Sequence, residues 1–302
     1  MIRIHRGCEL TAHAVLVLAS LAVLAPSLRA DPPAPDRLPS YFAWLTAGTG
    51  ELGAPLDGTP PRFAFKSSVA VISPKHLSEA AEPLSDFGSA VGPAVVGKSG
   101  DGKATWVATD VSYGFACGMA GCDQMTPPRV HGLALFDASL HAVAWSTGLV
   151  VAGSFVPNKP PPPIKPMTPP ALANAIDAGA EPAAAVFKAS LADPEALANT
   201  VADRKDAVLY GSELAERYVG APAVRATLRK WQLGFTVRDG IQAGVTGSRT
   251  SAWVAANVDA GKHGDQKTTP YRVFAIYDQH GADWQLVALQ FSAPTMTAAP
   301  KP

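Results

Sequence analysis

The two halves of the chain repeat the same short pattern, and this internal repeat restricts the fold more than any other feature. Each half contains a stretch that begins with Trp-Val-Ala, then an apolar stretch that ends in Asp, then a further Trp. The first half has them at 106–111, 133–137 and Trp145, and the second half at 253–258, 274–278 and Trp284. The order is kept, and the spacing differs only in the connections, where insertions are tolerated. The pattern therefore predicts a tandem duplication of one structural unit.

A proline-rich segment separates the two repeats. Residues 157–170 read PNKPPPPIKPMTPP, in which eight of fourteen residues are proline. Proline lacks a backbone donor and favours an extended conformation, so the segment is interpreted as a linker. A PxxP ligand for an aromatic groove is the alternative. The linker divides the chain into a first domain at 36–156 and a second at 171–296, with a disordered tail at 297–302.

The matched stretches have the composition of β-strands. They are short, rich in Val, Ala and aromatic residues, and bounded by Gly, Asp or Pro. Residues 206–210 predict one more short strand in the second half. In the first half, Pro74 and Pro83 leave only a less regular helix, at 77–91.

Helices are predicted ahead of the strands in the second half. Residues 220–231 predict a helix in which Val224, Leu228 and Trp231 share one face, because they are spaced by four and three residues. The Ala-rich region at 170–202 predicts two further helical segments. Helices followed by antiparallel strands indicate an α+β unit.

Several short segments of the second half follow one another in an order that is typical of a known protein family. They are Gly211-Ser212 after a short strand, residues 216–220 before a helix, residues 251–254 in a strand, and residues 284–287 with Phe291-Ser292 at the end. In this order they resemble the nuclear transport factor 2-like superfamily, specifically its SnoaL-like branch, over about residues 171–294. The first half resembles the family mainly through its likeness to the second.

The resemblance implies two cone-shaped α+β domains, each with helices packed on a curved antiparallel sheet around an apolar pocket. Some members of this superfamily are isomerases, dehydratases, cyclases or hydrolases, and many others are binding or assembly domains. The fold alone therefore does not select an activity.

The first thirty residues have the features of a secretory signal peptide. Arg3 and Arg6 precede an apolar run at 12–25, which is shorter than the roughly 20 residues that a membrane span needs. Small residues predict cleavage near Ala30, so that residues 1–30 are removed. The protein is then expected in the periplasm or outside the cell, without an integral membrane segment. Retention of the segment as an anchor is the alternative.

Cys117 and Cys122 are expected to form a disulfide. An exported protein meets an oxidising environment, and removal of the signal peptide takes Cys8 away, which leaves an even number of cysteines. Two alternatives stay open. A metal site made by both thiolates and His131 lacks a further ligand, and the two thiols can also form a free redox pair.

The charge balance and the motifs exclude several classes of function. The chain has 25 basic and 25 acidic residues, so nothing predicts binding to nucleic acid. The GxGxxG pattern at 48–53 is followed by Pro55, Pro60 and Pro61, which prevent the helix that a dinucleotide-binding motif requires. No G-x-S-x-G, P-loop or HExxH pattern occurs, and neither a cofactor nor a metal is predicted.

Asp110 and His131 are the candidates for acid–base chemistry. Asp110 and Asn257 hold equivalent positions in the two repeats, as do His131 and Arg272. A carboxylate and a histidine that face an apolar cavity can act as base and electrophile. Near a strand end, however, such residues usually turn the chain or meet solvent. The catalytic pattern of the family's enzymes cannot be placed on these residues, so no catalytic residue is assigned.

Four residues of the second domain are predicted to line one apolar cavity: Trp253, Arg272, Tyr277 and Gln290. Arg272 or Gln290 would supply its polar contact. The second domain is favoured because its more regular helix should close a better-defined cavity than the first domain can. Core packing is the alternative role for the matched tryptophans.

These observations favour an exported tandem-domain binding protein without catalysis of its own. Its partner would be an apolar small molecule, bound in a small apolar pocket of the second domain, or another protein. One alternative is a SnoaL-like pocket enzyme, an isomerase, dehydratase or hydrolase, which a buried carboxylate or histidine facing the pocket would favour. The other is a structural envelope or assembly protein, which would have filled cones and a large exposed apolar patch.

Overall fold

The computed structural model of the chain consists of two β-sheets with helices. It describes residues 37–47, 62–66, 88–113, 129–148, 171–213, 215–262 and 268–292, all within one compact unit at 32–302. Four predictions lie outside the described residues: the signal peptide at 1–30, the Cys117–Cys122 disulfide, the linker at 157–170 and the tail at 297–302. Among the described helices, none is long and apolar enough to cross a membrane.

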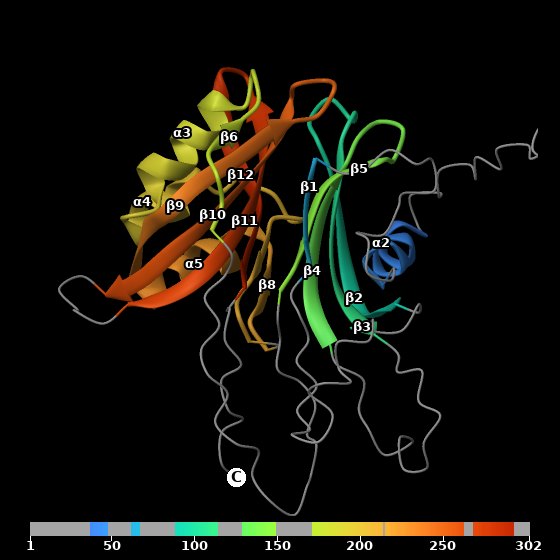
Figure 1. Ribbon diagram of the computed structural model, residues 1–302, viewed down its shortest axis with the longest axis horizontal. Helices are drawn as coiled ribbons and strands as arrows, with labels where there is room; N and C mark the ends of the chain where they lie inside the picture. The colour runs from blue at the N-terminus through green and yellow to red at the C-terminus, as the bar shows by residue number, and fades with distance from the viewer. Residues whose placement is uncertain are drawn as a thin grey trace, which may run out of the picture. The chain divides into compact units, whose positions relative to one another are not determined.

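The first half forms a five-stranded sheet (Figure 1). Its strands are β1 (Phe63–Lys66), β2 (Gly88–Lys98), β3 (Thr105–Tyr113), β4 (Arg129–Phe136) and β5 (Ala142–Thr147). They lie in the order β1-β5-β4-β3-β2, and all neighbours are antiparallel except β1 and β5. Helix α2 (Leu38–Ala47) covers one face, where Phe42 packs edge-on against Trp145.

The second half forms a seven-stranded sheet with three helices on one face (Figure 1). Its strands are β6 (Ala175–Ile176), β7 (Val208–Tyr210), β8 (Arg217–Val219), β9 (Leu233–Val245), β10 (Ser251–Lys262), β11 (Thr269–His280) and β12 (Asp283–Ser292). The helices are α3 (Glu181–Ser190), α4 (Pro194–Thr200) and α5 (Ala221–Trp231). The strand order is β6-β9-β10-β11-β12-β7-β8, and only the β6–β9 and β12–β7 pairs are parallel.

Helix α5 shows how local sequence builds this half. It follows Gly220, whose φ of 88° lies in a region that side chains disfavour and glycine adopts without strain. Val224 and Leu228 are buried in the core between the helices and the sheet, and Trp231 packs against that core. The shared helix face predicted from the spacing of these three residues is confirmed.

The two sheets contain their long strands in the same order. Strands β2, β3, β4 and β5 are adjacent in the first sheet, as β9, β10, β11 and β12 are in the second. In each sheet, a short strand from earlier in the half runs parallel to the last one, β1 beside β5 and β7 beside β12. The antiparallel sheets with helices confirm the predicted α+β class.

The predicted helix at 77–91 is wrong where the structure describes it, because residues 88–91 begin strand β2. They pair with β3 up to Val91, and the register then shifts before Val95. Gly92, with a φ of 79°, and Pro93 occupy this irregularity. Glycine and proline are the weakest helix formers, and pairing with a long neighbouring strand decides the structure of such a segment.

The two sheets pack face to face, and a cluster of buried side chains fills the layer between them, here called the inter-sheet layer. Alternation along each strand determines which residues enter it. In β3, Trp106 and Ala108 face the layer, whereas Val107 faces α2. In β10, Trp253 faces the layer, whereas Val254 faces the helices of its own half. The tryptophans that open the repeated stretches therefore pack between the sheets.

Candidate functional site

The inter-sheet layer contains the two residues predicted as acid–base candidates. Asp110 of β3 and His131 of β4 are direct cross-strand partners, and His131 Nδ1 lies 2.8 Å from Asp110 Oδ1. Both residues are buried, with exposed fractions of 4% and 0%. The other carboxylate oxygen, Oδ2, accepts a hydrogen bond from Arg217 at the start of β8. The Asp110–His131 pair thus joins the first sheet to the second.

The partners of His131 determine how many protons the pair holds. His131 Nε2 lies 2.9 Å from the carbonyl oxygen of Glu213, which can only accept, so Nε2 must carry a hydrogen. The Nδ1–Oδ1 contact then needs a second proton, on His131 or on Asp110. If both contacts of the ring are hydrogen bonds, the pair holds one proton between Nδ1 and Oδ1 in addition to the one on Nε2. Burial acts against this extra proton, because it lowers the pKa of His131.

His131 is surrounded by protein groups from both sheets. Its ring lies against the Tyr210 ring with centroids 4.5 Å apart, and its carbonyl oxygen accepts a hydrogen bond of 2.7 Å from Gln290 Nε2. Burial also raises the pKa of Tyr210 well above its usual range. A general base has to reach the proton it removes within hydrogen-bond distance. With both ring nitrogens occupied by protein atoms, His131 is arranged to hold the sheets together.

Asn257 and Arg272 form the equivalent pair in the second sheet. They are direct cross-strand partners of β10 and β11, and Arg272 Nε donates a hydrogen bond of 2.9 Å to Asn257 Oδ1. Asn257 Nδ2 in turn donates to Asp239 Oδ2 at 2.8 Å. Burial lowers the pKa of Arg272 to about 10. Both sheets thus bury a polar cross-strand pair between their two central long strands.

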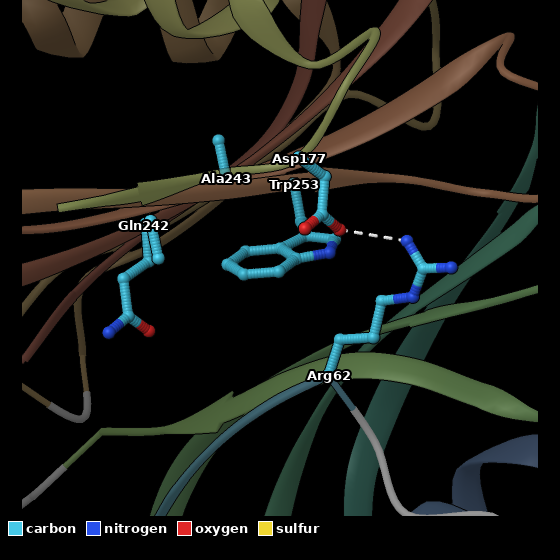
Figure 2. Close-up of a pocket in the computed structure, with 6 residues that line it drawn as sticks. Arg62, Asp177, Gln242, Ala243 and Trp253 are labelled. Atoms are coloured by element: carbon cyan, nitrogen blue, oxygen red, sulfur yellow. Dashed lines mark hydrogen bonds and ion pairs between the residues drawn. The ribbon is translucent and has the colours of Figure 1, made fainter.

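An open cleft lies where edge strand β6 of the second sheet meets the start of edge strand β1 of the first (Figure 2). Its volume is about 530 Å³, within the range of about 300–1,000 Å³ that is typical of small-molecule sites. The lining residues are Arg62, Ala175, Asp177, Gln242, Ala243 and Trp253. They combine a tryptophan that is only 3% exposed, two small residues and three polar side chains.

The side of the cleft formed by the second sheet is built on strand β9. Gly240 donates its backbone N–H to the carbonyl oxygen of Leu172 at 2.9 Å, and a side chain at Gly240 would lie only 2.3 Å from that oxygen. This close approach brings the segment before β6 onto β9. Asp177 follows β6, and its N–H donates to the Ala243 carbonyl oxygen at 2.9 Å. The backbone contacts thereby fix the position of Asp177 at the cleft.

Arg62 comes to the cleft from the first sheet. Its N–H donates to the carbonyl oxygen of Val143 at 2.8 Å, one residue before β1 begins to pair with β5. Its guanidinium Nη1 donates to Asp177 Oδ2 at 2.8 Å, the contact drawn as a dashed line in Figure 2. The two side chains are 57% and 47% exposed. This ion pair bridges the two sheets at the surface and remains open to solvent.

Trp253 and the ion pair meet over Gly244. A β-carbon built at Gly244 would lie 2.7 Å from Trp253 Nε1 and 2.8 Å from Asp177 Oδ2. Only glycine leaves room for both groups at this point. The N–H edge of the indole is therefore adjacent to the Arg62–Asp177 ion pair, as Figure 2 shows.

The structure does not bring the four predicted ligand residues into one cavity. Trp253 is 3% exposed within the inter-sheet layer and contributes to the cleft lining, and Arg272 and Gln290 are buried on the same face of the second sheet. Tyr277 lies on the opposite face of the second sheet, fully buried against the helices. The strand register explains the separation, because Trp253 pairs with Ile276, one residue away from Tyr277. Neighbouring residues of a strand point to opposite faces.

Three polar residues of the cleft were not identified from the sequence. Gln242 is adjacent to Ala255 in the sheet register, on the face of Trp253, so alternation along β9 offered a signal for it. Arg62 and Asp177 meet only because the two sheets pack together, and no local pattern carries that information. Among the described residues, no group of three or more His, Cys, Asp or Glu is placed to hold a metal ion.

Solved structures with low similarity match about two fifths of the chain. Neither a protein-family model nor a curated protein matches the chain. Similar solved structures include an NTF2-like protein of unknown function from Pseudomonas putida, with 18% identity and a TM-score of 0.30 over 39% of this chain and 88% of that one. An NTF-2 like protein of unknown function from Shewanella oneidensis has 14% identity and a TM-score of 0.30 over 37% and 97%. A domain with a cystatin-like fold from Nostoc punctiforme has 12% identity and a TM-score of 0.32 over 40% and 80%.

Proposed function

We propose that the chain is a tandem pair of nuclear transport factor 2-like units, and that it acts as a binding protein whose ligand occupies the cleft beside Trp253. The shared order of the long strands and the equivalent positions of the Asp110–His131 and Asn257–Arg272 pairs support the duplication. The cone arrangement of each unit and the SnoaL-like branch belong to the same proposal. The proposed binding function rests on the cleft.

Binding is favoured over catalysis by the arrangement of the ionisable groups. The Asp110–His131 pair has its hydrogen-bonding atoms directed at Glu213 and Arg217. At the cleft, the ionisable groups are the exposed Arg62 and Asp177, which neutralise each other. A small molecule in the cleft would meet this ion pair and Gln242, because the indole of Trp253 is only 3% exposed.

Export is part of the proposal and rests on the sequence. A signal peptide at 1–30 would deliver the protein to the periplasm or to the outside of the cell, where Cys117 and Cys122 would meet oxidising conditions. The ligand would then be a molecule of that compartment or a group on a protein partner. No nucleic acid or cofactor enters this function.

A bulky side chain introduced at the exposed residue Ala175 would fill the cleft and so test whether ligands bind there. Ala175 lines the cleft from β6, and its neighbour Ile176 is outside the lining although it is 44% exposed. Fragments that bind the wild-type protein are identified by ligand-observed NMR and then titrated against Ala175→Trp and Ile176→Trp. We expect Ala175→Trp to weaken the cleft binders at least about tenfold, or about 1.4 kcal/mol, and Ile176→Trp to leave them unchanged. Equal affinities for both variants would reject the cleft as the binding site.

A further inference from the structure

Both ring nitrogens of His131 lie within hydrogen-bond distance of an oxygen atom. Nδ1 lies 2.8 Å from Asp110 Oδ1, and Nε2 lies 2.9 Å from the carbonyl oxygen of Glu213. A neutral imidazole has one hydrogen and cannot donate to both oxygens, whereas a protonated imidazole can. The second half supplies the outer partners of the pair, because Glu213 receives one hydrogen bond and Arg217 donates to the other carboxylate oxygen. A proton between Nδ1 and Oδ1 therefore lies within the contact between the two sheets.

The surroundings of the ring act on this proton in opposite directions. Burial lowers the pKa of His131, while the Glu213 carbonyl and the Glu216 carboxylate raise it. An ionised Asp110 in direct contact with Nδ1 also favours the protonated ring. Without the proton, two acceptors would face each other at 2.8 Å where both side chains are buried, and neither could turn to water instead. The short Nδ1–Oδ1 distance therefore indicates that the proton is present when the sheets are packed.

Three further groups of the second half contact the pair and keep their charge near neutral pH. Tyr210 of β7 lies against the His131 ring, and burial raises the pKa of its hydroxyl well above its usual range, so it stays neutral. Gln290 of β12 contributes an uncharged amide. Burial lowers the pKa of Arg217 in β8, but an arginine starts so far above neutral pH that it remains charged. A change of pH near neutrality therefore acts on the Asp110–His131 pair itself.

We propose that the packing of the two sheets is a pH-sensitive contact, in which the Asp110–His131 pair holds one proton that it releases when the sheets separate at neutral or alkaline pH. In the unfolded chain the pair meets water, and the histidine loses its proton near its ordinary pKa of about 6.5. The packed pair holds the proton more tightly. Its stabilising contribution is therefore complete below about pH 6.5, and it is lost as the pH rises through the pKa of the packed pair.

Urea denaturation at about pH 6.5, 7.5 and 8.5 tests the linkage. One proton released on unfolding raises the equilibrium constant of unfolding by up to about tenfold for each pH unit, and we expect the wild-type protein to approach this dependence. His141→Gln is the matched control, because His141 of the same half forms a partly exposed pair with Asp137. This control should keep the wild-type pH dependence. An unfolding constant that stays level or falls as the pH rises would overturn the proposal.

The variant Asp110→Asn separates the contact from the proton. An asparagine amide can donate to the lone pair of a neutral His131 Nδ1, so the cross-strand contact forms without an extra proton. We expect the unfolding constant of this variant to lose most of its dependence on pH between about pH 6.5 and 8.5. The same dependence in Asp110→Asn as in the wild-type protein would show that another group releases the proton, and the proposal would be wrong.

A direct count of protons on the wild-type protein does not depend on how well a variant folds. Nitrogen NMR of labelled histidine shows which ring nitrogens carry hydrogen, and carbon NMR of labelled aspartate shows whether the carboxyl group is ionised. At about pH 7.5 we expect the Asp110–His131 pair to hold one proton more than an ionised aspartate with a neutral histidine. The exposed His280 should be neutral at this pH. A neutral His131 beside an ionised Asp110 would overturn the proposal.

Discussion

The two buried cross-strand pairs occupy the same position in the two sheets and use different chemistry. In the first sheet, Asp110 and His131 share a proton between two atoms that would otherwise both be acceptors. In the second sheet, Asn257 accepts from Arg272 and donates to Asp239, so each atom of its amide has a complementary partner. The first arrangement depends on a proton, and the second does not.

The two pairs also differ in which sheet supplies their third partner. Asp110 reaches Arg217 of the opposite sheet, whereas Asn257 contacts Asp239 of its own sheet. Removing one partner of a buried charged group leaves the other without compensation, which costs more than the pair contributes when intact. The comparison therefore predicts that the first-sheet pair is the more sensitive of the two to substitution.

The largest effect is expected for Asp110→Ala. The substitution leaves the Arg217 guanidinium, which is 22% exposed, without its carboxylate, and the buried His131 Nδ1 without its partner. We expect the free energy of unfolding to fall by about 3–5 kcal/mol, measured by urea denaturation with circular dichroism. A loss below about 1 kcal/mol would mean that the charges meet solvent and that the layer is not closed at this point.

A smaller effect is expected for Asp110→Asn. The amide nitrogen can donate to the lone pair of a neutral His131 Nδ1, so this contact no longer needs a shared proton. The charge-assisted hydrogen bond with Arg217 is weakened, and we expect a loss of about 2 kcal/mol. Denaturation under the conditions used for Asp110→Ala gives the comparison. If Asn costs as much as Ala, the Nδ1 contact contributes nothing and the stabilisation lies in Arg217 alone.

The converse substitution, Asn257→Asp, tests the second-sheet pair. It replaces a donor to Asp239 by a second carboxylate, which repels it, but it also gives Arg272 an ionic partner. Because these effects oppose each other, we expect a net loss of only about 1 kcal/mol. Urea denaturation measures it. A loss larger than that of Asp110→Asn would reverse the order of sensitivity that the comparison predicts.

The sequence predicted the strands because their pattern is local. The stretches at 106–111 and 253–258 lie within β3 and β10, and the short strand predicted at 206–210 is β7. The equivalence of Asp110 with Asn257 was visible as well, since the two stretches align without a gap. Period-two alternation assigns residues to two faces, and these assignments hold in both sheets.

The sequence did not indicate which elements pack against each face of a sheet. We predicted that Trp253 and Tyr277 line one apolar cavity, but Trp253 faces the other sheet, whereas Tyr277 packs against the helices. Alternation separates the faces without saying what covers them, and the register between β10 and β11 decides which residues share a face. The contact of Arg62 with Asp177 depends on the packing of two sheets across 115 positions of sequence. Such contacts have no local signature.

The smallest effect is expected for Arg238→Met, which removes a cross-strand ion pair outside the inter-sheet layer. Arg238 contacts both carboxylate oxygens of Asp259, and the two side chains are 31% and 25% exposed. Water and salt screen charges at such a position, and holding two long side chains in one geometry costs conformational entropy. We expect a loss of about 0–1 kcal/mol, measured by urea denaturation at low and high salt, and smaller at high salt. A loss that matched Asp110→Ala would show that burial between the sheets is not what makes the Asp110–His131 pair sensitive, because an exposed pair of similar geometry would contribute equally.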